Sequence, residues 1–398
     1  MKKVLFICSV YKPNVGGVET AIDELAKFYV EQGLQVTILT KRFPFNLPDY
    51  EEIDHIPVVR IDRPKTFKDY DKTWRALAAY KDVITSDIIH VMGVRRPMTY
   101  IALMLGKLWK VPVIINFSGG DIFDKNDAES MRIWEEGKDI TPQSIQQADF
   151  YIAFSKDIAE QAHACIPDLP DIAVVYAGIY TKNIKYVRRF EALRPYLLSV
   201  RRLYYAKGLD ILISAFARVQ KKHPKFDLYI VGDGPEMDNL KKQTQALGFE
   251  DEVKFMGTQP LETVYALMKG SVAHICPSRS EGGGTVNIEA QAAGTIAIGS
   301  TAGGIPEYIA DNETGLLFQS EDVFDLTKKL LAIIEDETLR ERLVQTALHR
   351  IDTFDWNHVA RQYLDMYTKA RATYNNRSLV PWKDNVIENW QELQDIWM

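Results

Sequence analysis

After an apolar run that predicts a strand, the chain reads Pro277-Ser-Arg-Ser-Glu-Gly-Gly-Gly-Thr-Val-Asn-Ile-Glu-Ala-Gln-Ala-Ala-Gly294, and a helix is expected to begin near Gly284. Glycines let backbone N–H groups approach a ligand closely, and a helix N-terminus offers unpaired donors and about half a positive charge. The stretch therefore predicts a seat for a diphosphate. Glu281 and Glu289 are spaced to accept hydrogen bonds from sugar hydroxyls on either side of it. In the alternative interpretation the glycines serve only tight packing, and Glu289 is a surface residue of the helix.

Outward from this stretch, short runs rich in valine and isoleucine alternate with longer segments of helical spacing along the whole chain. Continuous apolar runs indicate strands buried on both faces. Their alternation with helices predicts right-handed βαβ units in parallel, doubly wound sheets, so the expected fold class is α/β. Strands are expected at 4–9, 36–40, 58–61, 88–91, 113–117, 150–154, 173–176, 196–200, 226–231, 253–256, 272–277, 295–299 and 316–318.

A domain boundary is expected between residues 177 and 195, where the sequence lacks a clean period and is locally basic. We expect an N-terminal domain at 1–185, a C-terminal domain at 194–350, and C-terminal helices with a tail at 354–398. Open α/β sheets bind ligands beyond the carboxyl ends of their strands. Two similar domains with a cleft between them would therefore place the site in that cleft.

Composition excludes several classes of protein. Among 398 residues, 48 are Lys or Arg and 54 are Asp or Glu, a net charge of −6, which argues against a broad nucleic-acid-binding face. Three cysteines lie far apart, which predicts neither a disulfide framework nor a zinc site and favours a reducing cytoplasm. The apolar start of the chain predicts a first strand rather than a signal peptide, and no window of about 18 apolar residues predicts a membrane span.

A second charged motif follows the strand expected at 196–200. It reads Arg202-Leu-Tyr-Tyr-Ala-Lys207-Gly208, and two cations at the carboxyl end of a strand suit neutralisation of a diphosphate leaving group. A solvated basic turn is the alternative interpretation.

A third motif lies between the first strand and the first helix, where Gly16 and Gly17 suggest a dinucleotide-binding turn. The G-x-G-x-x-G spacing is missing, and the second strand ends in Lys41-Arg42 instead of the acid that would bind a ribose. A nicotinamide-dependent dehydrogenase is therefore disfavoured.

Six short motifs follow one another along the chain in a characteristic order. They are G-G-x-E at 16–19, R-L-x-x-x-K-G at 202–208, V-G-D-G-P at 231–235, V-x-F-x-G at 253–257, the stretch quoted first, and G-G-x-x-E at 303–307. This order resembles glycosyltransferase family 4, from Val4 to about Tyr367. The resemblance implies a GT-B fold of two facing Rossmann-like domains, and transfer of a sugar from a nucleotide donor with anomeric retention.

The resemblance also implies roles for individual residues. Arg202 and Lys207 would hold the donor diphosphate, Glu281 would take the donor sugar, and Glu289 would take the ribose hydroxyls. The remaining donor-site residues would be glycines and their neighbours: Gly283, Gly284 and Thr285 at the diphosphate, Gly232, Met256 and Gly257 near the base, and Gly16 and Gly17 against the donor phosphates or the acceptor.

Departures from the family pattern mark where the prediction is open. Arg201 stands where the family often has Gly, and Gly283 where it often has Phe. In place of the family's H-G-x-D segment the chain reads Ser118-Gly-Gly-Asp121, and a serine cannot reproduce an imidazole. Ser118 and Asp121 are candidates for contact with the sugar or acceptor. His90 is a catalytic candidate, with a structural role as its alternative.

The expected substrates follow from the same resemblance. Asp69-Tyr70-Asp71 resembles the D-x-D that other glycosyltransferases use to hold a metal, but it lies in a polar run before a helix, so no metal and no cofactor are expected. The donor would be a UDP- or GDP-linked sugar and the acceptor a sugar or lipid-linked hydroxyl. A sugar-nucleotide epimerase and a nucleotide-sugar-binding protein of weak activity are the alternatives. The oligomeric state stays open.

The C-terminal segment resembles the last helix of the family, which crosses back to the N-terminal domain. Beyond it five apolar residues have helical spacing: Trp382, Val386, Trp390, Leu393 and Trp397. The acidic polar face of this tail would be repelled by anionic lipid, which favours packing on the N-terminal domain over contact with a membrane. We expect a cytoplasmic protein, with peripheral contact at the inner membrane face as the alternative. Analogy suggests bacterial cell-surface polysaccharide or glycolipid synthesis.

Overall fold

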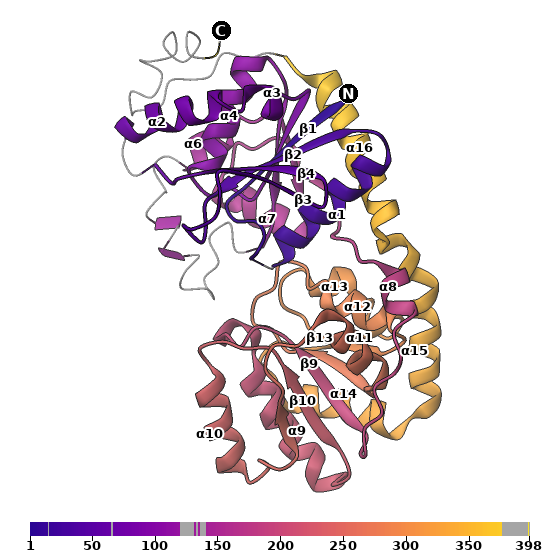
Figure 1. Cartoon of the computed structure of the whole chain (residues 1–398). Coiled ribbons are helices and arrows are strands. Elements are labelled where there is room, and N and C mark those ends of the chain that lie inside the picture. The colour runs from indigo at the N-terminus through magenta and orange to yellow at the C-terminus, as the bar shows by residue number, and fades with distance from the viewer. Residues whose placement is uncertain are drawn as a thin grey trace. The chain divides into compact units, whose positions relative to one another are not determined.

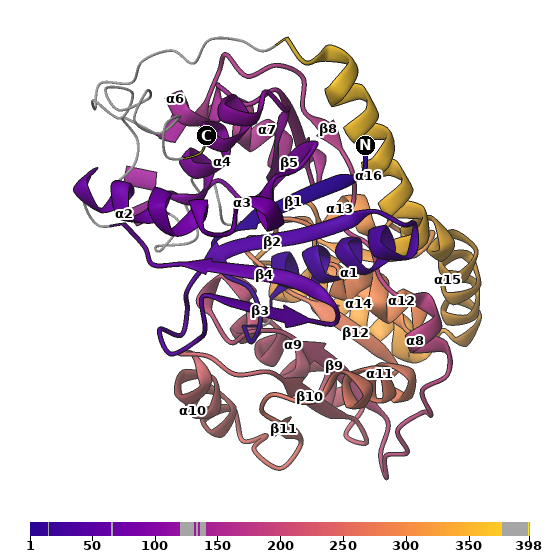
Figure 2. The same ribbon diagram turned by 45° about the horizontal axis from the view of Figure 1, so that its top comes forward.

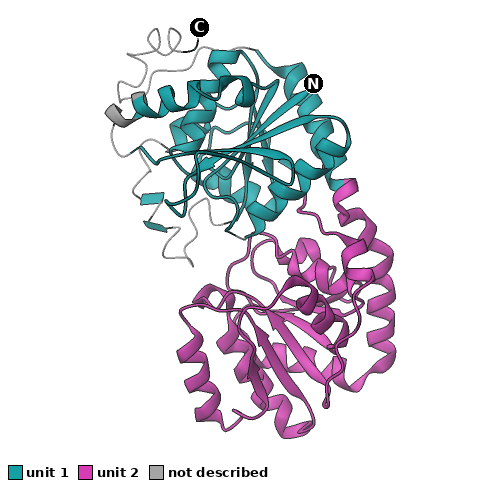
Figure 3. Cartoon of the chain, viewed as in Figure 1, with its two compact units in different colours: residues 1–175, 359–398 teal, residues 176–358 magenta. Residues whose placement is uncertain are grey.

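The computed structural model of the chain describes residues 1–14, 16–64, 67–119, 131–132, 134–135, 141–375 and 397, without the side chains at 67–69, 71 and 141. Two units are distinguished: unit 1 holds residues 1–175 and 359–398, and unit 2 holds residues 176–358 (Figure 3). The break at Tyr176 precedes the expected boundary because Ile179 and Ile184 are buried in a core of unit 2. The Ile179 amide also donates to the Phe354 carbonyl at 2.8 Å.

Unit 1 is built on an eight-stranded sheet in the order β3-β4-β2-β1-β5-β6-β7-β8, part of which is seen in Figure 2. All neighbouring strands are parallel except β3 and β4. The strands are β1 (Lys3–Cys8), β2 (Gln35–Lys41), β3 (Tyr50–Ile53), β4 (Ile56–Ile61), β5 (Ile88–Met92), β6 (Val113–Phe117), β7 (Phe150–Ala153) and β8 (Ala173–Val174). Residues of β5 and β6 are buried without exception, as expected for strands covered on both faces.

The helices of unit 1 connect these strands, and one long helix reaches it from unit 2. They are α1 (Gly17–Glu31), α2 (Phe67–Ala78), α3 (Lys81–Ile84), α4 (Met98–Trp109), α6 (Thr141–Ile145), α7 (Lys156–Cys165) and α16 (Trp356–Thr373). The first three residues of α16 belong to unit 2, and from Val359 onward the helix belongs to unit 1. No helix among the described residues is both long and apolar enough to cross a membrane.

Unit 2 contains a fully parallel six-stranded sheet in the order β11-β10-β9-β12-β13-β14, of which Figure 1 labels β9, β10 and β13. Its strands are β9 (Tyr196–Val200), β10 (Asp227–Val231), β11 (Val253–Phe255), β12 (Ala273–Cys276), β13 (Ile296–Ser300) and β14 (Gly315–Phe318). Its helices are α8 (Thr181–Lys185), α9 (Leu209–Lys222), α10 (Met237–Leu247), α11 (Leu261–Gly270), α12 (Val286–Ala292), α13 (Ile305–Tyr308), α14 (Val323–Glu335) and α15 (Glu337–Arg350).

Two cores cover the two faces of this sheet. In β9, Leu197 packs in the core formed with the apolar sides of α9 and α14. Leu198 packs in the other core, formed with the apolar sides of α11 and α12. Successive side chains of a strand point to opposite faces, so a continuous apolar run supplies both cores at once. The expected α/β class with parallel sheets is therefore confirmed.

The strands expected from apolar runs are all present, and the structure adds β3. This strand reads Tyr-Glu-Glu-Ile, lies at the edge of its sheet and pairs antiparallel with β4. Its partly exposed Glu51 pairs with Arg60 at 2.6 Å. An edge strand with two charges has no continuous apolar run, which is why the sequence pattern missed it.

Candidate active site

The residues singled out in unit 2 gather at one edge of its sheet. Arg201 follows β9, Gly232 follows β10, Met256 and Gly257 follow β11, and the Glu281 loop follows β12. These four strands are neighbours and parallel, so their carboxyl ends lie side by side. The Gly232 amide donates to the Gly257 carbonyl at 2.8 Å. This is the edge at which open α/β sheets bind ligands.

The loop after β9 is fixed against the loop after β12 by Gly208. This residue has φ +63°, and a Cβ on it would lie 2.0 Å from the Pro277 carbonyl oxygen. Only glycine tolerates both the left-handed conformation and this approach. The short turn Tyr205–Lys207 precedes it, and the Arg279 amide donates to the Ala206 carbonyl at 2.8 Å. The K-G pair of the motif thus sets Lys207 beside the β12 loop.

Glu281 is the centre of an ion cluster, defined by Arg201, Lys207, Ser278 and Glu281. The Arg201 guanidinium pairs with Glu281 Oε2, and Lys207 Nζ lies 3.1 Å from the same oxygen. Ser278 Oγ donates to it at 3.4 Å. All four side chains are partly or fully buried, so these charges are screened less than surface charges would be.

The two adjacent arginines have different surroundings. Arg201 has a side chain only 5% exposed and contacts Glu281, whereas Arg202 is exposed, with its guanidinium 5.5 Å from the Tyr204 ring. The sequence pattern selected Arg202 for the diphosphate and treated Arg201 as a departure only. The structure brings Lys207 and Glu281 together and adds Arg201 to them, while Arg202 lies outside the ion cluster.

The glycines after Glu281 are tightly fitted. A Cβ on Gly283 would lie 2.8 Å from the Tyr308 hydroxyl, and Gly284 has φ +78°. A phenylalanine at position 283 would meet Tyr308, which is fully buried. The helix expected from near Gly284 begins at Val286, and Thr285 precedes it without a side-chain capping hydrogen bond.

Glu289 lies inside α12 and is half-buried. Burial raises the pKa of its carboxyl to about 7, and a hydrogen bond from Tyr265 Oη, 3.5 Å from Oε1, partly opposes that shift. A carboxyl with this pKa is roughly half ionised near neutral pH and readily accepts hydroxyl hydrogen bonds once a ligand supplies them.

Asn287 is a residue that sequence reasoning missed. It is fully buried, and neither amide atom has a hydrogen-bond partner within the described part of the chain. Its Nδ2 would lie 2.9 Å from a Cβ on Gly284. Unsatisfied buried amides are rare, so this polar group belongs with the glycine loop as a candidate ligand contact. Asn287 alternates with Glu289 and Gln291 along α12, so nothing in the sequence distinguished it from its polar neighbours.

The candidates in unit 1 follow two parallel strands of its sheet, β1 and β6. Gly16 and Gly17 begin α1, and Ser118 is buried directly after β6. Asp121 lies outside the described residues, as do the tail residues Trp382, Val386, Trp390 and Leu393. The Trp397 ring is described and lies 5.8 Å from the Trp109 ring of α4 in unit 1.

His90 requires a correction. It lies in β5 with no exposed surface, its Nδ1 is 2.6 Å from the Tyr367 hydroxyl of α16, and its ring is 5.2 Å from that of Phe6. Burial lowers its pKa to about 3, so the ring is neutral at pH 7. An enclosed neutral ring bonded to a packing helix cannot touch a substrate. His90 therefore has the structural role that was the alternative to a catalytic one: it holds α16 on unit 1.

Tyr367→Phe is expected to lower the free energy of unfolding by about 1–3 kcal/mol, because it leaves the buried His90 Nδ1 without its partner. Urea unfolding followed by far-UV circular dichroism measures the effect. Tyr186→Phe is the matched control, since Tyr186 is 80% exposed and the substitution should change nothing. Equal stability of Tyr367→Phe and wild type would contradict the assigned role of His90.

Asp69 and Asp71, which gave the D-x-D resemblance, have side chains outside those described. Among the described residues, no group of three or more His, Cys, Asp or Glu side chains is arranged to hold a metal ion. The absence of a metal from the reaction stays a prediction.

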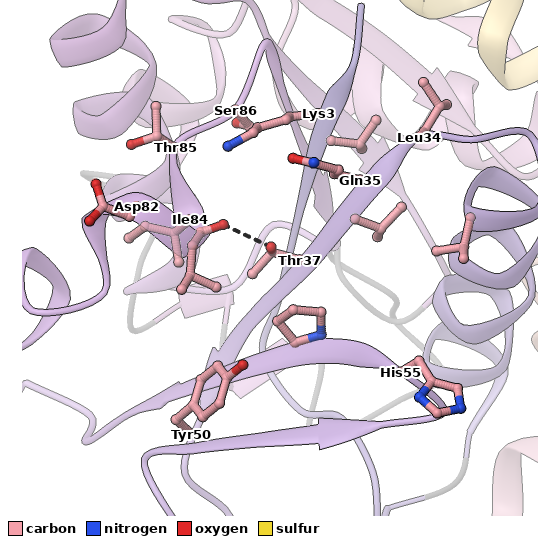
Figure 4. A pocket seen from close by; sticks show the side chains of 15 residues that line it. Lys3, Leu34, Gln35, Thr37, Tyr50, His55, Asp82, Ile84, Thr85 and Ser86 are labelled. Atoms are coloured by element: carbon pink, nitrogen blue, oxygen red, sulfur yellow. Dashed lines mark hydrogen bonds between the residues drawn. The ribbon is translucent and has the colours of Figure 1, made fainter.

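A cavity of about 380 Å³ lies in unit 1 and is lined by residues such as Lys3, Gln35 and Ser86 (Figure 4). Thr37 Oγ1 donates to the Val83 carbonyl at 2.9 Å at this cavity. Lys3 and Gln35 are the first residues of β1 and β2, so the cavity opens at the amino ends of the strands. It is therefore at the sheet edge opposite to Ser118, which follows the carboxyl end of β6.

Two family models of glycosyltransferases match successive parts of the chain. A model described as Glycosyltransferase Family 4 matches residues 15–183, and one described as Glycosyl transferases group 1 matches residues 182–350. The N-acetyl-alpha-D-glucosaminyl L-malate synthase of Bacillus anthracis is 25% identical over 372 residues, which cover 89% of this chain and 94% of the relative.

Two solved structures share the fold. The sucrose-phosphate synthase of Thermosynechococcus elongatus superposes with a TM-score of 0.79 at 21% identity, covering 94% of this chain and all of that one. The HepE protein of Anabaena, solved in complex with UDP-glucose, superposes with a TM-score of 0.74 at 19% identity, covering 93% of this chain and all of that one. The likeness therefore extends over nearly the whole chain.

Proposed function

Because the chain belongs to glycosyltransferase family 4, we propose that it is a metal-independent hexosyltransferase that moves a sugar from a nucleotide-diphosphate donor to an acceptor hydroxyl with anomeric retention. The observation that carries the proposal is the group of Lys207, Glu281 and Glu289 at the carboxyl edge of the unit 2 sheet. A cation and two carboxylates at this edge match the charges and hydroxyls of such a donor.

The donor would lie along this edge in an extended form. Lys207 and the exposed Arg202 would neutralise the diphosphate. The backbone amides of Gly283, Gly284 and Thr285 would donate further hydrogen bonds to it. Glu289 would accept from the ribose hydroxyls and Glu281 from the donor sugar, and the base would lie near Gly232, Met256 and Gly257. The UDP-glucose complex of the Anabaena protein, which has the same fold, supports a nucleotide-sugar donor, UDP- or GDP-linked.

In the proposed reaction the bond between the anomeric carbon and the diphosphate oxygen breaks, and the acceptor oxygen forms the new bond. The acceptor proton passes to the departing diphosphate. Glu281 is bound by two cations, which makes it a poor nucleophile toward the anomeric carbon. We therefore propose that the acceptor attacks from the face that the diphosphate leaves, which retains the configuration. Gly16 and Gly17 of unit 1 would contact the acceptor or the donor phosphates, and Ser118 would contact the sugar or the acceptor.

The test of this proposal is a thermal-shift panel of nucleoside diphosphates and nucleotide sugars, followed by turnover of the best donor with and without EDTA. A ligand at 100 times its Kd should stabilise the protein by about 2.7 kcal/mol. Turnover that needs an acceptor and survives EDTA is expected. Turnover without an acceptor would indicate the epimerase alternative, and binding without turnover would indicate a nucleotide-sugar-binding protein. A role in cell-surface polysaccharide or glycolipid synthesis is part of the proposal only by analogy.

Ser118→His is expected to slow turnover of the preferred donor, because an imidazole is larger than a hydroxyl and would take the space of a sugar placed beside residue 118. Wild type is expected to prefer a donor other than the plain glucose nucleotide, since a serine leaves room for a bulkier sugar. Steady-state rates on several donors measure both effects. If the substitution changes neither the rates nor the ranking of donors, Ser118 does not face the sugar.

A further inference from the structure

The contacts of Glu281 fall on only one of its two carboxylate oxygens. Arg201, Lys207 and Ser278 all engage Oε2. Within the described part of the chain, no hydrogen bond or ion pair is made by Oε1. A carboxylate has acceptor sites on both oxygens. One oxygen of Glu281 is thus held by the protein, and the other is open to a ligand.

The two cations of this cluster differ in how firmly they are placed. Arg201 directly follows β9, is 5% exposed, and contacts Cys276 Sγ at 2.6 Å as well as Glu281. Its backbone is fixed by the Arg201 amide, which donates to the Val231 carbonyl at 2.9 Å, and by Gly232, whose Cβ would lie 1.9 Å from the Arg201 carbonyl oxygen. Lys207 lies in a short turn, is 19% exposed, and has a flexible side chain.

The proposed donor creates a conflict for Lys207. Its ammonium neutralises Glu281 in the structure, yet the proposed reaction needs it on the diphosphate. If Lys207 were the sole counter-ion of Glu281, moving it to the donor would leave a partly buried carboxylate without a cation beside a diphosphate of the same sign. Unpaired buried charges are costly, and like charges repel strongly where water is scarce.

We propose that Arg201 is a positioning residue that keeps Glu281 neutralised while Lys207 transfers to the donor diphosphate. Arg201 holds Glu281 Oε2 both before the donor binds and after Lys207 has moved to the diphosphate. It thereby directs Glu281 Oε1 toward a hydroxyl of the donor sugar. This inference rests on the proposed function, because it assigns a role toward a nucleotide-diphosphate donor. Arg201 acts through Glu281 and Lys207 and does not itself touch the reacting atoms.

The experiment compares four variants: Arg201→Met, Arg201→Lys, Glu281→Gln, and the double variant Arg201→Met, Glu281→Gln. Dissociation constants for UDP, GDP and the best nucleotide sugar are measured by isothermal titration calorimetry. Arg201→Met should weaken nucleoside diphosphate binding about tenfold or more, because Lys207 stays with the uncompensated Glu281. Adding Glu281→Gln should restore binding to within about threefold of Glu281→Gln alone, because the carboxylate that required Arg201 is gone. Arg201→Lys should recover most of the lost affinity.

Arg340→Met is the matched control. Arg340 lies in α15, has a side chain 27% exposed, pairs with Glu337, and donates to the Ile333 carbonyl at 2.7 Å, so it contacts neither Glu281 nor the turn that carries Lys207. Removing this charge should leave the dissociation constants within about twofold of wild type. An equal loss in Arg340→Met would mean that any partly buried arginine of unit 2 affects binding, which would contradict a specific role of Arg201.

Two other outcomes would overturn the inference. One is that Arg201→Met binds nucleoside diphosphates as tightly as wild type. The other is that the double variant binds as weakly as Arg201→Met, the result that a merely structural role of Arg201 predicts. If Arg201→Met does not fold, the comparison uses the two other Arg201 variants. These are Arg201→Lys and the double variant, in which no carboxylate is left unpaired. Failure of the proposed function is recognised separately, because wild type would then bind no nucleotide and Glu289→Gln would have no effect.

Discussion

Lys207→Ala is expected to lower kcat about hundredfold or more, with a similar fall in kcat/KM. In the proposed reaction, negative charge grows on the diphosphate as its bond to the sugar breaks. An ammonium group beside that diphosphate stabilises the transition state more than the bound donor, so its loss reduces the rate of the chemical step. Steady-state kinetics with the donor chosen from the thermal-shift panel measures both parameters. A variant with only a raised KM would assign Lys207 to ground-state binding.

Lys222→Ala is the control for that variant. Lys222 also lies in unit 2 and pairs with Glu335 at 2.6 Å, but its side chain is 58% exposed. Surface ion pairs contribute little to stability. Both kinetic parameters should therefore stay within about twofold of wild type, which separates loss of Lys207 from a general loss of positive charge.

Glu289→Gln is expected to weaken binding of the nucleotide sugar by about 1.5–3 kcal/mol, because an amide replaces a carboxylate that accepts two hydroxyl hydrogen bonds. Wild-type affinity should rise about tenfold from pH 6 to pH 8, since burial places the pKa of Glu289 at about 7 and binding needs the ionised form. The variant should lose this pH dependence. A nucleotide sugar suits the titration better than a free nucleoside diphosphate, whose terminal phosphate itself titrates near pH 6.

The same pKa predicts an opposite effect on stability. A carboxyl whose pKa is raised on folding makes the free energy of unfolding fall as pH rises from about 4.5 to about 7, because the unfolded chain releases its proton first. Glu289→Gln removes that cost. The variant should therefore be at least as stable as wild type at pH 8 while it binds more weakly. Unchanged affinity for the free nucleoside diphosphate would remove Glu289 from the site.

Much of the fold could be predicted because buried parallel strands leave continuous apolar runs in the sequence. The same rule missed β3, whose Glu51 and Glu52 lie at a sheet edge. The boundary between the units was expected between residues 177 and 195, whereas unit 2 begins at Tyr176. Residues after Tyr176 have no regular period, yet Ile179 and Ile184 are buried in a core of unit 2, which no periodic pattern records.

The candidate site was predictable where close backbone approach demands glycine. Gly208 must lie against Pro277, so the motif that contains it could be recognised without a structure. Side-chain direction could not be read in that way. Arg201 and Arg202 are adjacent and identical in type, and only the path of the chain after β9 decides that Arg201 meets Glu281. His90 likewise gained its partner from a helix 277 residues further along the chain.

The passage of α16 from unit 2 into unit 1 has a consequence for synthesis on the ribosome. The nascent chain completes β5 and β6 early, but Tyr363 and Tyr367, the partners of Asn116 and His90, emerge only after all of unit 2. About 250 residues separate the end of β6 from Tyr367, so at about 5–20 residues per second this delay lasts about 12–50 s. During that time the sheet of unit 1 lacks one of its covering helices and exposes apolar and polar groups that are later buried. Unit 2, which is continuous in sequence, can finish folding first, so the N-terminal half is the part of the chain that most needs a chaperone.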